Sequence, residues 1–85
     1  MSSHPTDFQG DVLAAIRSAV EGAIAGARCA VSGGEGHYTI SVTSPAFAGL
    51  NMVASQRLVY GAIAHLMKGA APPIHAVDSL QTQVG

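Results

Sequence analysis

The chain has 85 residues, a length that fits one domain. Because 48% of the residues are hydrophobic and only 11% are charged, the composition excludes disorder over the whole chain. The formal net charge of −1 argues against a protein whose affinity for nucleic acid depends on a basic surface. The single cysteine, Cys29, excludes an internal disulfide and a zinc site built from cysteine pairs.

The N-terminus lacks the basic and apolar regions of a signal peptide, and no apolar run is long enough to span a membrane. We therefore expect a cytoplasmic protein. Residues 1–5 are predicted to be a flexible tail, and residues 6–85 to form the single domain.

The first predicted element is a helix that begins near residue 6 and ends near residue 24. Thr6 and Gln9 have the spacing of a capping box, in which each side chain bonds a free amide of the first turn. Apolar residues then recur every four positions and predict one buried helix face: Phe8, Val12, Ile16, Val20 and Ile24.

The hydrophobic period changes to two after this helix. Residues 27–32 and 38–43 alternate between apolar and polar side chains, which predicts two half-buried strands. The glycine-rich stretch 33–36 lies between them, so the pair is predicted to be an antiparallel hairpin. Cys29 lies on the apolar side of the first strand, where a buried, unreactive thiol is the favoured interpretation over a reactive one.

A second helix is predicted from Asn51, with Gly69 as a candidate C-cap. Its expected apolar face comprises Ser55, Leu58, Val59, Ala62, Ile63 and Leu66. Residues 74–80 are predicted to form a third strand, and the last five residues to be frayed. The order helix, strand, strand, helix, strand predicts an α+β fold in which both helices cover one face of a three-stranded sheet.

Chemical motifs are sparse. The chain contains no nucleophile elbow and no phosphate-binding glycine loop of the Walker type, so we expect a protein that is not an enzyme. No two histidines have helical metal-binding spacing, so the chain is not expected to complete a metal site alone. Gly33 to Gly36 formally matches the Gly-x-x-Gly loop of KH domains, but Glu35 would repel phosphate and a strand turn is favoured.

The segment from Val31 to Val77 resembles the BolA-like family, in particular its bacterial IbaG-type branch. The resemblance rests on five motifs in order: Val-Ser-Gly before the turn, His37-Tyr38 leading into an alternating strand, Phe47-Ala48-Gly49, Gln56-Arg57-Leu58-Val59-Tyr60, and Ile74-His75-Ala76-Val77. The last of these is similar to the strongest signature of the family. The resemblance implies a fold similar to class II KH domains, in agreement with the element order.

The resemblance also implies a partner, a monothiol glutaredoxin of the CGFS type, and a [2Fe-2S] cluster shared with that glutaredoxin and glutathione. No cofactor is expected in the isolated chain, which we expect to be a monomer or a weak homodimer. His75 is the implied cluster ligand and His37 a candidate second ligand. The implied partner surface comprises Gly34, Glu35, Gly36, Arg57, Ile74, His75 and Ala76.

These implications predict an adaptor in iron–sulfur cluster trafficking or iron homeostasis. The alternative is a transcriptional regulator that binds nucleic acid through the KH-like fold, which the four Lys and Arg residues against five acids do not favour. A small interaction domain with a different partner is the third interpretation.

Overall fold

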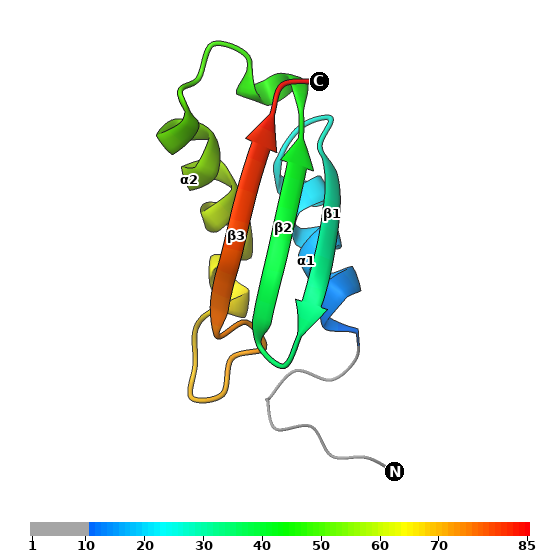
Figure 1. Ribbon diagram of the computed structural model, residues 1–85, viewed down its shortest axis with the longest axis vertical. Coiled ribbons are helices and arrows are strands. Elements are labelled where there is room, and N and C mark those ends of the chain that lie inside the picture. Colours follow the sequence, from blue (N-terminus) through cyan, green and yellow to red (C-terminus); the bar gives the residue numbers. More distant parts are fainter. Residues whose placement is uncertain (1–10) are drawn as a thin grey trace.

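A computed structural model describes residues 11–85 of the chain. In order, the elements are α1 (Val12–Ala23), β1 (Arg28–Gly34), β2 (His37–Thr43), η1 (Pro45–Phe47), α2 (Met52–Ile63), η2 (Ala64–Leu66) and β3 (Ala76–Gln83). The sheet order is β1-β2-β3, with β1 and β2 antiparallel and β2 and β3 parallel. Both helices lie behind the sheet in Figure 1, which confirms the predicted α+β fold. Within residues 11–85, the helices are all too short or too polar to cross a membrane.

Helix α1 begins at Val12, where the Asp11 carboxylate accepts a hydrogen bond of 3.2 Å from the amide of Ala14. This bond satisfies one of the amides that the first turn of a helix leaves free. The helix ends at Ala23, close to the predicted end. The predicted tail, the capping box of Thr6 and Gln9, and Phe8 lie outside the described residues.

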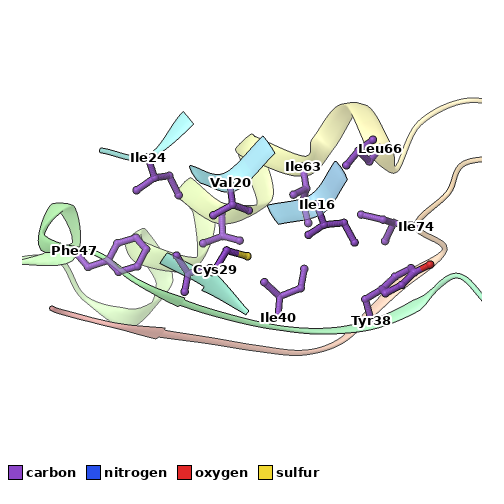
Figure 2. Close-up of a cluster of buried hydrophobic side chains, with 12 residues drawn as sticks. Ile16, Val20, Ile24, Cys29, Tyr38, Ile40, Phe47, Ile63, Leu66 and Ile74 are labelled. Atoms are coloured by element: carbon purple, nitrogen blue, oxygen red, sulfur yellow. The ribbon is translucent and has the colours of Figure 1, made fainter. Parts of the chain in front are cut away.

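The core fills the space between the sheet and the two helices. Alternate residues of β2 are buried while their neighbours are exposed, as period-two patterning requires. Figure 2 shows Phe47 and Ile24 at one end of this core and Tyr38 and Ile74 at the other. Its members are Ile16, Val20, Ile24, Cys29, Tyr38, Ile40, Val42, Phe47, Val59, Ile63, Leu66 and Ile74.

The predicted face of the second helix was partly wrong. Helix α2 buries Ser55, Val59 and Ile63, which lie four residues apart, whereas Leu58 is 43% exposed. One position amounts to about 100° of rotation, since a helix has about 3.6 residues per turn, so Leu58 turns away from the sheet. The helix ends at Ile63 and is followed by the short η2, well before the predicted cap at Gly69.

The third strand lies further along the chain than predicted. Ile74 precedes β3, is only 1% exposed, and donates its amide to the carbonyl of Leu66 at 3.1 Å. Three of the five residues expected to fray are instead paired, because Gln81 to Gln83 lie beside Ser41 to Thr43 of β2. Their polar side chains gave no apolar signal, since Gln81 and Gln83 are exposed and Thr82 is only half-buried.

Candidate functional site

The β1–β2 turn meets the start of β3 at one end of the sheet (Figure 1), and most of the predicted site residues belong to these two segments. Gly34 pairs with His37, which leaves a two-residue turn made of Glu35 and Gly36. Both turn residues have positive φ, 54° for Glu35 and 86° for Gly36. Positive φ at both central positions is typical of the tight turns that match the twist of a β-hairpin. Glu35 is exposed at the tip of this turn.

His75 is anchored on this turn. The amides of His75 and Ala76 both donate to the carbonyl of Gly36, at 2.8 and 2.9 Å. A Cβ atom added to Gly36 would lie 2.6 Å from both Cγ and Nδ1 of His75, so the imidazole rests directly against the glycine backbone. The histidine nevertheless remains exposed to solvent. The turn therefore fixes the base of the His75 side chain and leaves the residue open to a partner.

His37 lies next to this contact. It is the first residue of β2 and pairs with Ala76, the residue that follows His75. Its Nδ1 atom lies 3.1 Å from Oδ1 of Asp78, with the side chains 58% and 56% exposed. The tertiary structure thus brings both predicted histidines to neighbouring strands at the same end of the sheet. Asp78 was not among the predicted site residues, and its distance of 41 positions from His37 gave no local signal.

The other residues of the predicted partner surface are not equivalent. Gly36 and Ala76 contribute backbone beside His75, Gly34 pairs with His37 in the hairpin, and Arg57 is exposed on α2 in the helical layer. The side chain of Ile74, another predicted contact residue, is buried in the core. Its apolar side chain instead anchors the segment that carries His75.

Cys29 is a buried side chain and is not suited to bind a metal. It is buried on β1, and its amide donates to the Glu21 carboxylate at 3.0 Å. Burial, with a smaller contribution from the negative charge of Glu21, raises the pKa of the Cys29 thiol from 9.0 to about 11, while Arg17 acts in the opposite direction. The thiolate is the form of cysteine that binds metals, and the raised pKa disfavours it at neutral pH. Cys29 is therefore a core side chain, as predicted.

The donor set of the site fits a shared iron centre better than a site closed by this chain. Nowhere in residues 11–85 do three or more histidine, cysteine or acidic side chains gather closely enough to hold a metal. Imidazole is an established replacement for thiolate at the iron of a [2Fe-2S] cluster. The absence of a side chain at Gly36 provides the cradle in which the His75 ring lies.

Comparison with known proteins identifies the family. The family model for a BolA-like protein matches residues 12–83. The chain belongs to the BolA-like family. Its fold is similar to that of a BolA homologue from Coxiella burnetii, with 28% identity, a TM-score of 0.73, and coverage of 88% of this chain and 92% of that one.

Two further BolA structures extend the comparison. BolA1 from Mus musculus is 26% identical with a TM-score of 0.66, and the match covers 99% of this chain and 73% of the mouse chain. BolA1 from Arabidopsis thaliana is 18% identical with a TM-score of 0.73, covers 89% and 94% of the two chains, and supports the fold alone. No curated protein sequence matches this BolA-like chain.

Proposed function

We propose that this BolA-like protein is a non-enzymatic adaptor that binds a monothiol glutaredoxin of the CGFS type and shares a [2Fe-2S] cluster with it and with glutathione. Its role would be in iron–sulfur cluster trafficking or iron homeostasis in the cytoplasm. The observation that carries the proposal is the exposed His75, held against Gly36 at the meeting point of the turn and β3. The Val31-Ser32-Gly33 segment and Gln56 support placement in the IbaG-type branch.

The local structure supports a ligand role for His75 in three ways. Its backbone is held by Gly36, so the side chain starts from a fixed point. The buried Ile74 precedes it and holds this segment on the core. The residue itself is exposed, so a partner protein can approach it without unfolding any element.

A cluster of this type supplies an iron that needs two terminal ligands, and histidine ligation raises its reduction potential. The residues of this chain would supply the imidazole, orient it, and present the turn to the partner. Because the chain offers few ligands, the thiolates must come from the glutaredoxin and glutathione. We expect the isolated chain to be a monomer or a weak homodimer without a cofactor.

The test is a titration of cluster-loaded monothiol glutaredoxin with this protein, followed by visible absorption and circular dichroism. Wild-type protein should change the spectrum, and His75→Ala should abolish that change while keeping the native far-ultraviolet circular dichroism. His65→Ala is the matched control, since His65 is also exposed but lies on η2. An unchanged response for His75→Ala would contradict the assignment.

The nucleic-acid alternative gains no support from the distribution of charge. The four basic residues lie on different parts of the fold, at Arg17 in α1, Arg28 in β1, Arg57 in α2 and Lys68 after η2. A protein that neutralises several phosphates needs its cations along one surface. A steep decrease of DNA affinity with salt would nevertheless favour this function over the adaptor.

A further inference from the structure

The exposed pair formed by His37 and Asp78 joins two strands at the candidate site. His37 Nδ1 and Asp78 Oδ1 lie 3.1 Å apart, and more than half of each side chain is exposed. An exposed pair of this kind contributes little to folding stability, because water solvates both groups well and competes for the contact. A contribution to folding stability therefore does not explain the pair well. Its position near His75 suggests a role in the candidate site.

Asp78 lies at an irregularity in β3. Tyr38 pairs with Val77 and Thr39 pairs with Ser79, so Asp78 is an extra residue in the ladder. Regular alternation from Val77 would turn Ser79 toward the core and Leu80 toward water. The extra residue restores Leu80 to its place opposite Ile40 of the core.

Asp78 itself is exposed on the open face, beside His37. Bulges occur preferentially where a side chain must be re-aimed, often next to functional sites. The bulge thus keeps the apolar residues of β3 on the core side, while the Asp78 carboxylate contacts His37, the first residue of β2.

The chemistry of the pair fixes the form of the imidazole. An ionised carboxylate only accepts hydrogen bonds, and a neutral imidazole carries its proton on one ring nitrogen. The 3.1 Å contact therefore requires the proton on Nδ1 of His37, which donates to Asp78. The Nε2 atom is then left with a free lone pair. Carboxylate groups orient metal-binding histidines in proteins in this way.

The other side chains that could serve as an iron ligand are less suitable than His37. Glu35 offers a hard carboxylate oxygen, which suits an iron otherwise held by thiolates poorly. Cys29, the only thiol of the chain, is buried in the core. His37 adjoins Gly36, against which the ring of His75 rests.

We propose that Asp78 is a positioning residue that holds His37 in the Nδ1–H form and so makes its Nε2 atom the second imidazole ligand of the shared cluster. This inference rests on the proposed function, because it needs the cluster that the glutaredoxin brings. It adds to that function a residue specific to the bulge of β3.

The first measurement uses the isolated protein and needs no cluster. Long-range ¹H–¹⁵N correlation spectra at alkaline pH, where imidazoles are neutral, report which ring nitrogen carries the proton. His37 should be in the Nδ1–H form in the wild type and shift toward the Nε2–H form in Asp78→Ala. Asp78→Glu should restore part of the Nδ1–H form, and Ser79→Ala, an exposed neighbour on β3, should leave the spectrum of His37 unchanged. An unchanged His37 tautomer in Asp78→Ala would overturn the inference.

The second measurement follows cluster loss from the glutaredoxin complex to a chelator. Asp78→Ala should speed the loss by about 10-fold or more, the usual effect of removing a group that orients a metal ligand. His37→Ala should speed it at least as much, and the double variant no further than His37→Ala alone, since Asp78 acts through His37. Ser79→Ala should match the wild type.

The two proposals fail in different ways. If His75→Ala abolishes the spectral change but His37→Ala and Asp78→Ala lose the cluster at the wild-type rate, the adaptor function stands and the role of Asp78 is refuted. If the wild-type protein does not change the glutaredoxin spectrum, the adaptor function itself fails, and the cluster role of Asp78 fails with it. Additive effects of His37→Ala and Asp78→Ala would also refute action through His37.

Discussion

Replacing Gly36 with alanine tests the central contact of the site, the packing of the His75 ring on the hairpin turn. The new Cβ would lie 2.6 Å from Cγ and Nδ1 of His75 and 3.1 Å from its Cβ. Carbon atoms in proteins do not approach this closely, so the ring must move or the turn must open. The backbone also holds Gly36 at φ 86°, a conformation that side chains with a Cβ rarely adopt.

The cost has two parts. Placing a residue that has a Cβ in a left-handed conformation reduces the folding stability by about 1–2 kcal/mol. Forcing extra volume into an occupied position costs about 1–3 kcal/mol more. We expect Gly36→Ala to lower the free energy of unfolding by about 2–5 kcal/mol, a large part of the roughly 5–15 kcal/mol that holds a domain together.

Denaturant unfolding followed by circular dichroism measures this loss, and Gly34→Ala is the matched control. Gly34 lies in the same hairpin, but its φ is not positive and a Cβ there would meet nothing within 4 Å. Gly34→Ala should therefore change stability by no more than about 1 kcal/mol, in either direction. In a His75→Ala background, Gly36→Ala should lower the free energy of unfolding by a smaller amount, because the ring that the new Cβ would meet is absent. Equal costs for the two glycine variants, or a Gly36→Ala cost unaffected by His75→Ala, would refute the packing of His75 on Gly36.

Two further predictions concern buried side chains. Cys29 should react slowly with thiol reagents in the folded protein, and rapid labelling under native conditions would contradict its core position. Because the unfolded thiol loses its proton near its ordinary pKa of 9.0 and the folded thiol near pKa 11, the folded state binds more protons between these values. The free energy of unfolding should therefore fall as pH rises from 9 to 11, and it should fall less in Cys29→Ala; identical slopes would exclude the linkage. Ser44 is fully buried, donates to the carbonyl of Ala25 at 2.7 Å and accepts from the amide of Ala46 at 3.0 Å. Ser44→Ala should cost about 1–3 kcal/mol in denaturant unfolding because it removes both part-buried hydrogen bonds of this hydroxyl, and a loss below about 0.5 kcal/mol would argue against that role.

The order and type of the elements followed from the sequence, because hydrophobic periodicity is local. Alternation through residues 38–43 marked β2, and the four-residue spacing of Ile16 and Val20 marked α1. His75 was predicted as a site residue from a short motif that resembles the BolA-like signature. Each of these signals lies within a few residues of the feature that it predicts.

The tertiary structure decided what local patterns do not contain. The continuation of β3 to Gln83 depends on pairing with β2, and its last three side chains are polar and so give no hydrophobic pattern. Leu58 was misplaced because a repeat of three to four residues does not fix which side of a helix meets the sheet.

The details of the site depend on contacts between residues far apart in the chain. Gly36 must be a glycine because His75, 39 positions later, lies where its side chain would be. Asp78 meets His37 across two strands, at the point where one extra residue in β3 shifts the register and the core stays packed. The sequence by itself determined the order and type of the elements, since these depend on local patterns, and its resemblance to the family pointed to His75. Only folding brought Gly36, His37, His75 and Asp78 to one end of the sheet, because pairing and register between strands are set by the burial of the whole apolar face.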